Sequence, residues 1–309
     1  MLVTLCGGVG AARFLSGLVQ VVPPTSITAI VNTGDDLVLH GLTICPDLDT
    51  ISYTLAGLNN EETGWGVVGE SWRTMERLRS LGGAAWFALG DLDLATHLFR
   101  SELLRQGATL TDATQQLTAA LGIEVTVLPA TNDPVATKVT LAETGEELDF
   151  QDYFVGRHHE PRLRDVRFEG VDASTPAPSV LSSIANAELL IIAPSNPIVS
   201  LGPILAIPGL RDAVETRRST NVAISPIVAG AALKGPAADM LSDLGHEPTA
   251  VGVARLYAPL AATFILDEAD AAHAPEIEAL GMTCRITNTV MSSPAASSNL
   301  ASIVLGVTP

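Results

Sequence analysis

Short, continuous apolar runs recur along the chain, separated by longer segments of mixed polarity. The runs cover residues 2–5, 27–31, 86–89, 189–193, 222–224 and 263–266. Strands that are buried on both faces of a parallel sheet show this continuous apolar character, and the segments between the runs are long enough for crossover helices. The pattern predicts an α/β fold: a doubly wound, mostly parallel, Rossmann-like sheet covered by helices.

The stretch 125–170 interrupts this pattern. Residues 137–141 and 147–150 flank the turn-forming sequence Glu-Thr-Gly-Glu, which predicts a hairpin, and the densest basic segment of the chain follows from Arg157 to Arg167. We expect a small α+β lobe here, inserted into a core made of residues 1–124 and 171–309. The basic segment either attracts an anionic substrate or forms a solvated surface.

A glycine-rich turn, residues 7–14, follows the first predicted strand and opens a helical stretch. Gly8 and Gly10 lack a Cβ, so backbone N–H groups and the positive end of the helix can approach a phosphate closely. Arg13 stands where a dinucleotide fingerprint has its third glycine, and no Gly-Lys-Ser/Thr triplet of a Walker loop is present. We predict a diphosphate-binding turn of neither common kind. The alternative is that the glycines only pack the helix on the sheet.

Polar residues follow the other apolar runs. They occupy residues 32–36, 90–93, 194–197, 225–226 and 267–268. Ligands of open α/β sheets bind outside the carboxyl ends of the strands, so these segments are expected to meet at one edge. Ser195 and Asn196, in a loop whose shape two prolines fix, are candidates for phosphate or base recognition. Lys234, one of two lysines, is a candidate phosphate contact.

Two groups of carboxylates are candidates for chemistry. Asp35, Asp36, Asp47 and Asp49 fall within fifteen positions, and carboxylates beside a phosphate site suit a divalent cation such as Mg²⁺. We nominate Asp36, Asp47 and Asp49 as metal ligands, with helix capping as the alternative for Asp47.

In the second group, Asp91 and Asp93 begin a predicted helix, and His97 lies on the same helical face as Asp93. Asp91 is nominated to orient a substrate hydroxyl or to accept its proton, with helix capping as the alternative.

Composition excludes several classes of protein. The net charge of −17 argues against general affinity for nucleic acid or anionic membranes. Although the mean hydropathy is +0.33, no apolar run approaches the ~20 residues of a spanning helix. No basic segment precedes the first apolar run, so no signal peptide is expected. Three cysteines without paired spacing (Cys6, Cys45 and Cys284) predict reduced thiols in a cytoplasmic protein.

Six motifs, taken in order, resemble those of the 2-phospho-L-lactate transferase family of coenzyme F-420 biosynthesis. They are GGVGAARF (7–14), NTGDD (32–36), HGLTICPDLDTISYTLAG (40–57), GDLDLATHL (90–98), APSNPIVSLGPIL (193–205) and SPIVAGAALKGP (225–236). Each motif alone is weak, whereas the ordered set is specific and spans nearly the whole chain.

The resemblance implies a reaction. Members of that family join a guanylylated three-carbon acid, of the phospholactate or phosphoenolpyruvate type, to the ribityl hydroxyl of Fo (7,8-didemethyl-8-hydroxy-5-deazariboflavin) and release GMP. It implies Mg²⁺ held by aspartates of the TGDD and CPDLD segments, catalytic roles for Asp36 and Asp49, and a homodimer. Fo is a flat, largely apolar tricycle, so Trp65 and Trp86 are nominated for its pocket, with Asp91 at its hydroxyl. The alternative is that both tryptophans lie in the core.

A second function remains open at this point. A related family shares the GGxG turn and the doubly wound sheet but binds nucleotide sugars and regulates carbon metabolism without catalysis. The CPDLDT and GDLDLATHL segments favour the transferase. A dehydrogenase that uses NAD is disfavoured by Arg13 in the fingerprint. The 125–170 lobe is the candidate lid or acceptor-binding region.

Overall fold

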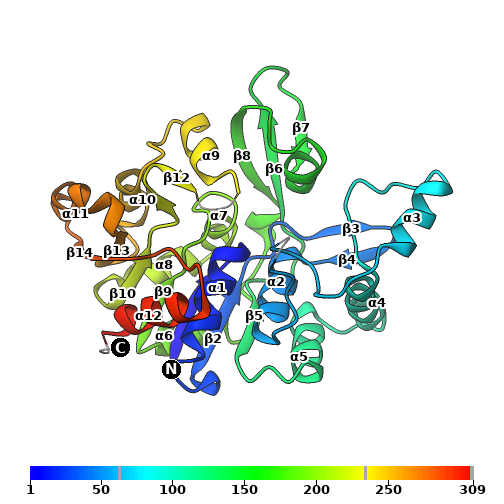
Figure 1. Cartoon of the computed structure of the whole chain (residues 1–309), viewed down its shortest axis with the longest axis horizontal. Coiled ribbons are helices and arrows are strands. Elements are labelled where there is room, and N and C mark those ends of the chain that lie inside the picture. Colours follow the sequence, from blue (N-terminus) through cyan, green and yellow to red (C-terminus); the bar gives the residue numbers. More distant parts are fainter. Residues whose placement is uncertain (62–63, 233–234, 307–309) are drawn as a thin grey trace.

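The computed structural model describes residues 1–61, 64–232 and 235–306, and a seven-stranded sheet runs through its centre (Figure 1). The strands are β1 (Leu2–Cys6), β2 (Ile27–Val31), β5 (Thr126–Pro129), β9 (Leu189–Ile192), β10 (Asn221–Ile224), β13 (Thr263–Asp267) and β14 (Thr283–Thr287). Their order is β14-β13-β10-β9-β1-β2-β5, and all neighbouring pairs are parallel. This confirms the predicted Rossmann-like α/β fold.

Both faces of the sheet are covered because its strands are apolar on both sides. In β9, Leu190 and Ile192 belong to one buried cluster and Ile191 to the other. The helices on the first cluster include α6 (Val180–Asn186), α7 (Leu201–Ala206), α8 (Leu210–Thr216), α10 (Ala250–Tyr257) and α11 (Ala274–Ala279). Those on the second are α1 (Gly8–Leu18), α2 (Pro46–Leu55) and α12 (Pro294–Leu305). The sheet is therefore the middle of three layers.

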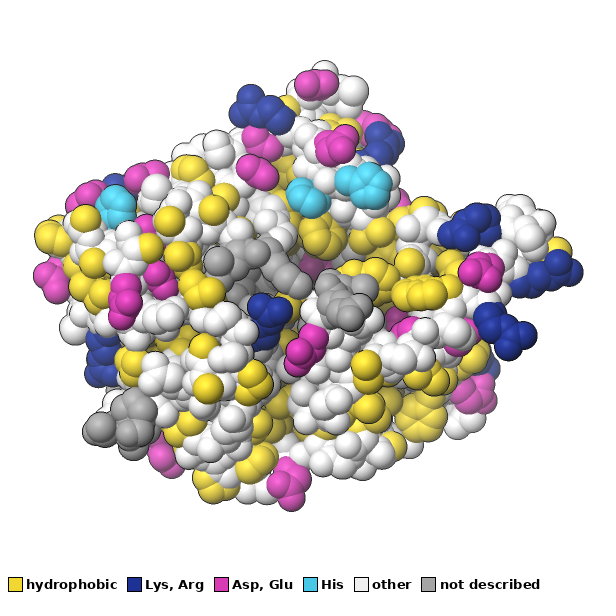
Figure 2. Space-filling view, in the orientation of Figure 1, with side chains coloured by type: hydrophobic (Ala, Val, Ile, Leu, Met, Phe, Trp, Pro, Cys, Tyr) yellow, Lys and Arg dark blue, Asp and Glu magenta, His cyan; other side chains and the backbone are white. Residues whose placement is uncertain are grey.

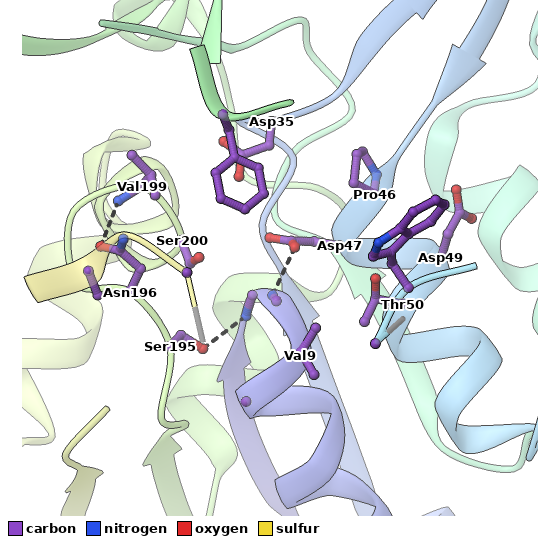
Figure 3. Close-up of a pocket in the computed structure, with 18 of the residues that line it drawn as sticks. Val9, Asp35, Pro46, Asp47, Asp49, Thr50, Ser195, Asn196, Val199 and Ser200 are labelled. Carbon is purple, nitrogen blue, oxygen red and sulfur yellow. Dashed lines mark hydrogen bonds between the residues drawn. The ribbon is translucent and has the colours of Figure 1, made fainter. Parts of the chain in front are cut away.

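The order of the strands reverses between β1 and β9. After β1 the chain adds β2 and β5 on one side, and after β9 it adds β10, β13 and β14 on the other. At such a reversal the connections leave in opposite directions, so a crevice forms outside the carboxyl ends of the two central strands. The glycine turn after β1 and the Pro-Ser-Asn-Pro loop after β9 meet in this crevice, as Figure 3 shows.

A three-stranded antiparallel sheet rises above this edge (Figure 1). Its strands are β6 (Ala136–Leu141), β7 (Glu147–Asp149) and β8 (Leu163–Glu169). Its apolar face packs on Val199 and Met240 of the core. The small sheet lies within the predicted 125–170 lobe, whereas β5 belongs to the main sheet. The division into a core and an inserted lobe stays a prediction.

The basic segment of the lobe is largely matched by acidic side chains. The pairs are Arg157 with Glu146, Arg162 with Asp243, and Arg167 with Glu147. All three arginines are on the surface, where ion pairs are screened by water. These contacts favour the solvated-surface interpretation of the segment over attraction of a substrate.

An arm extends from the sheet between β2 and β5 (Figure 1). It contains β3 (Leu37–Leu39), β4 (Leu42–Ile44), α3 (Arg73–Ser80), α4 (Asp91–Arg105) and α5 (Leu110–Ala120). The strand expected at 86–89 is wrong, because this run forms a loop. Its residues Phe87 and Leu89 pack instead with Ile44 and Met75 in a small cluster of the arm. An apolar run can fill such a cluster without pairing in a sheet.

The remaining elements are short. They are β11 (Ile227–Val228), β12 (Ala231–Ala232), α9 (Ala237–Asp243), a π-helical turn (Asp152–Gly156) and 3₁₀ turns at Pro24–Ser26, Val171–Ala173, Arg218–Thr220 and Glu268–His273. Among the described residues, no helix combines the length and the apolar character that crossing a bilayer requires.

Candidate active site

A cavity of about 590 Å³ opens at the crevice between β1 and β9. Its walls come from the glycine turn, the starts of α2 and α4, the loops after β9, β10 and β14, and residues 150–155 of the lobe. In the space-filling view a hollow lies between the lobe and the core, while basic side chains gather over α3, away from it (Figure 2). Arg13 is the single Lys or Arg among the described residues that line the cavity.

The glycine turn has a fixed shape for two steric reasons. Gly8 has a φ of +72°, a left-handed conformation that side chains disfavour. Gly10 packs so closely on the loop after β9 that a Cβ would lie 2.2 Å from the carbonyl oxygen of Pro194. The turn is also tied from outside, because the N–H of Gly7 donates to Ser195 Oγ at 3.2 Å. Gly8 and Gly10 both line the cavity, as the sequence predicted for a ligand-binding turn.

Asp47 closes the other side of the turn. The carboxylate accepts hydrogen bonds from the N–H of Gly8 at 2.8 Å and from Asn32 Nδ2 at 3.0 Å. Figure 3 shows its side chain directed at the glycine turn, with Asp35 on the opposite side of the same space. The predicted alternative, that Asp47 caps its own helix, does not describe this contact, because Gly8 begins α1 rather than α2.

Asp35 and Asp47 form a buried acidic pair. Burial raises the pKa of Asp47 to about 6, against the hydrogen bonds from Asn32 and Gly8. Burial, and then the charge of Asp47, raise the pKa of Asp35 well above its ordinary value. Asp35 Oδ1 is buried with no hydrogen-bond partner among the described residues. Two such carboxylates fit a hard cation, which would offset both the burial and the repulsion.

This pair sets a pH dependence for the metal-free protein. Because the folded state raises the pKa of Asp47 to about 6, it binds the proton more tightly than the unfolded chain does. The stabilisation is complete below the ordinary carboxyl pKa and is lost as the pH rises through 6. We expect a loss on the order of 3 kcal/mol in the free energy of unfolding. Chemical denaturation of the wild type and Asp47→Asn across this range measures it, and a difference independent of pH would contradict it.

A second buried network lies further along α2 and α4. Arg100 binds both carboxylate oxygens of Asp49, one of them at 3.1 Å, and His97 lies between Asp49 and Asp93. Asp49, Asp93 and His97 could each offer a ligand atom within 4.8 Å of one another, which is a possible Asp-Asp-His metal site. The Arg100 guanidinium already neutralises Asp49, so the Asp35–Asp47 pair suits a cation better.

Two carboxylates of the arm accept hydrogen bonds at helix starts and so connect the α3 and α4 regions. Glu70 accepts hydrogen bonds from the N–H groups of Leu92 at 2.9 Å and Asp93 at 3.1 Å, at the start of α4. Asp91, in α4, accepts from the N–H of Thr74 at 3.1 Å, at the start of α3. The Glu70 carboxylate fills the space beside Gly90, where a Cβ would lie 1.8 Å from Oε2. These contacts favour a capping role for Asp91.

One wall of the cavity is aromatic. Phe150 and Phe154 stack with ring centroids 5.5 Å apart, and Tyr53, Trp65 and Phe87 complete the wall. Trp65 is 45% exposed, lines the cavity and packs edge-on against Trp72 with ring centroids 5.8 Å apart. A flat apolar ligand would match this wall.

The structure brings most of the predicted site residues together. The cavity is lined by Gly8, Gly10, Arg13, Asp47, Asp49, Trp65, Ser195 and Asn196. Asp36 and Trp86 line a neighbouring hollow beneath the lobe. Asp91 faces α3 instead of the cavity, and Lys234 lies outside the described residues.

Sequence reasoning missed several residues of the site. Asp35 was noted without a role, and Tyr53, Glu70 and Arg100 were not noted at all, although all four take part in its polar contacts. Nothing in the sequence distinguishes the buried Arg100 from the exposed Arg105, which follows five positions later on the same helix. Only the tertiary contact with Asp49 distinguishes Arg100.

The fold and this cavity define a Rossmann-like α/β protein with a candidate active site where the order of its strands reverses. A sequence model of one family, described as 2-phospho-L-lactate transferase CofD, matches residues 2–280, and the chain belongs to this family. It is therefore a transferase enzyme, and the resemblance found in its motifs is confirmed.

Phosphoenolpyruvate transferases and 2-phospho-L-lactate transferases are both similar to nearly the whole chain. A phosphoenolpyruvate transferase from Kitasatospora aureofaciens is 42% identical over 311 residues, covering 99% of this chain and 97% of the relative. A 2-phospho-L-lactate transferase from Methanosarcina barkeri (strain Fusaro / DSM 804) is 37% identical over 306 residues, covering 99% and 98%. The solved structure of protein BH3568 from Bacillus halodurans has a TM-score of 0.64 over 98% of both chains at 18% identity, which shows the fold alone.

Proposed function

We propose that the chain transfers a phospholactyl or phosphoenolpyruvyl group from a guanylylated donor to the ribityl hydroxyl of Fo, with Mg²⁺ and with release of GMP, in coenzyme F-420 biosynthesis. One observation carries the proposal: a single cavity joins a glycine turn, a pair of neighbouring buried carboxylates and an aromatic wall. A diphosphate, a divalent cation and a flat acceptor each have a matching surface there. Family membership favours this reaction over the nucleotide-sugar-binding regulator.

The donor's diphosphate is assigned to the glycine turn. The first N–H groups of a helix have no partner within it, and at α1 those of Gly7 and Gly8 are bonded to Ser195 and Asp47. This leaves the N–H groups of Val9 and Gly10 for phosphate oxygens. Arg13 adds a cation on the same helix.

The nucleoside of the donor would lie on the β10 and β14 side of the turn. Ser195 and Asn196 stay candidates for contacts with it, although both hold the shape of their loop: Ser195 Oγ accepts from Gly7, and Asn196 Oδ1 accepts from the N–H of Ile198 at 2.9 Å. Lys234, also nominated by the sequence, falls outside the described residues.

Asp35 and Asp47 are the residues that would hold Mg²⁺. The uncompensated Oδ1 of Asp35 and the raised pKa of Asp47 both fit a bound cation. When bound, Mg²⁺ would neutralise charge on the diphosphate oxygens. Asp36 and Asp49 stay predictions as ligands. Asp36 lines the neighbouring hollow, and Arg100 occupies the carboxylate of Asp49.

The aromatic wall would bind the tricycle of Fo. Truncating Trp65 to Leu should weaken Fo binding by about tenfold, because an aromatic contact contributes about 0.5–1.5 kcal/mol beyond its area. Trp86→Leu should change it less, since Trp86 lines the neighbouring hollow. Fluorescence titration of Fo measures both affinities. A larger loss in Trp86→Leu than in Trp65→Leu would move the acceptor to the space beneath the lobe.

The assay that tests the function supplies the protein with Mg²⁺, Fo and each guanylylated donor in turn, and identifies the product by mass. A product with the mass of Fo plus the phospho-acid, formed with GMP, is the expected result. No transfer with either donor, together with binding of a nucleotide sugar, would favour the regulator instead. We also infer that the protein is cytoplasmic and forms a homodimer. Light scattering on the purified protein tests the oligomeric state.

A further inference from the structure

The start of α4 carries a chain of buried polar contacts that ends at the cavity. Tyr53 donates its hydroxyl proton to Asp93 Oδ1 at 2.7 Å, and His97 Nε2 lies 3.2 Å from Asp93 Oδ2. On the far side of the imidazole, Arg100 Nη1 lies 3.4 Å from His97 Nδ1 and 3.1 Å from Asp49 Oδ2. All five residues are buried, and all of them except Arg100 line the cavity.

The direction of these contacts follows from the arginine. A guanidinium has no acceptor, so a hydrogen bond between Arg100 and His97 makes Nδ1 the acceptor and places the ring proton on Nε2. That N–H faces Asp93 Oδ2 but is not aligned for a hydrogen bond, and it has no other partner among the described residues. Burial, and then the charges of Asp49 and Asp93, raise the pKa of Tyr53, so its hydroxyl stays a donor.

Asp93 thus accepts one side-chain hydrogen bond, from Tyr53 to Oδ1, while His97 Nε2 lies 3.2 Å from Oδ2 without an aligned hydrogen bond. Both oxygens therefore keep a lone pair for a further donor. The side chain is 11% exposed and lines the cavity beside Tyr53. Asp91, the carboxylate nominated from the sequence, is occupied at the start of α3 by Ser71 and Thr74.

We propose that Asp93 is the catalytic residue that accepts and orients the attacking hydroxyl of the acceptor, and that Tyr53, His97 and Arg100 are positioning residues that act through it. The inference rests on the proposed transfer reaction. As the acceptor oxygen bonds to the distal phosphorus, its proton passes to a carboxylate oxygen of Asp93. The bond from that phosphorus to the bridging oxygen breaks, and the electron pair leaves on GMP.

The test compares variants in the transfer assay with Mg²⁺, Fo and the donor that the wild type accepts. Asp93→Asn should lower kcat by about 10²–10⁴-fold, with the dissociation constant of Fo changed less than about threefold. His97→Gln keeps an N–H donor toward Asp93, so it should retain a higher kcat than His97→Leu, which has none. A structural role alone would not separate these two variants of similar size.

Glu102→Gln, on the exposed face of the same helix, is the control expected to behave as the wild type. Should Asp93→Asn fail to fold, Tyr53→Phe removes a single oxygen and should still lower kcat with little change in KM. Tyr257→Phe, in the core, is its matched control.

Two results would overturn the inference while the proposed function stands: product formation by Asp93→Asn within about threefold of the wild type, or loss of turnover in Asp91→Asn alone. If the wild type itself forms no product, the proposed function fails and the role of Asp93 falls with it.

Discussion

Replacing Asp35 with Asn is expected to lower turnover by about 10²–10³-fold while the metal-free protein stays folded. A bound metal contributes several kcal/mol to transition states of this kind, and about 1.4 kcal/mol corresponds to each tenfold. Burial and the charge of Asp47 raise the pKa of Asp35, so a neutral amide removes the cost of an ionised carboxylate at this position. The variant should therefore keep or exceed the thermal stability of the wild type without Mg²⁺, and lose the stabilisation that Mg²⁺ gives.

Asp36→Asn is the comparison that makes this result decisive. The two aspartates are adjacent in sequence, but Asp35 lines both the cavity and the neighbouring hollow, whereas Asp36 lines the hollow and not the cavity. Thermal unfolding with and without Mg²⁺, and turnover, are measured for both variants. If the Mg²⁺ effect survived in Asp35→Asn and vanished in Asp36→Asn, the cation would belong with Asp36, as the sequence pattern suggested.

Gly10→Ala is expected to destabilise the protein and to weaken donor binding together. The added Cβ would lie 2.2 Å from the carbonyl oxygen of Pro194, a backbone atom that cannot rotate away. Overpacking of this kind costs about 1–3 kcal/mol, and the start of α1 must shift from the loop after β9. Because the shift displaces the N–H groups assigned to the diphosphate, calorimetry should show at least about tenfold weaker binding of the guanylylated donor.

Gly156→Ala is the matched control for this prediction. Its Cβ would meet only the edge of Trp86 at 3.7 Å, an ordinary van der Waals distance. The variant should unfold at the temperature of the wild type and bind the donor equally well. Gly10→Ala with unchanged stability and donor affinity would show that the turn adapts freely, against the steric argument.

The central part of the fold was predictable because its strands are apolar on both faces. Five of the predicted runs correspond to β1, β2, β9, β10 and β13. The two edge strands were missed: β14 has exposed positions at Thr283 and Arg285, and β5 lies at the start of the stretch 125–170 that was assigned to the lobe. The run at 86–89 was misassigned because burial in the small cluster of the arm produces the same apolar pattern as burial in a sheet.

The position of the site was predictable, whereas the choice among neighbouring carboxylates was not. Parallel strands bring their carboxyl ends to one edge, so residues after β1 and β9 had to meet. Asp47 and Asp49, however, lie two residues apart on α2, about 200° around the helix, and they enter different clusters. Which carboxylate faces the cavity depends on the rotation of a helix or turn, and tertiary contacts set that rotation.

The hydrogen bonds of Glu70 at the start of α4 and of Asp91 at the start of α3 limit which segments of the site can be exchanged between relatives. Glu70 caps α4, Asp91 caps α3, and the Glu70 carboxylate fills the space that a side chain at position 90 would need. Consider a chimera in which a relative receives the segment that contains Trp65 and Glu70 but keeps its own residue at position 90. If that residue is larger than glycine, its side chain would clash with the Glu70 carboxylate. The segments 64–74 and 90–93 would therefore have to be transplanted as a pair, because the contacts that shape one depend on the other.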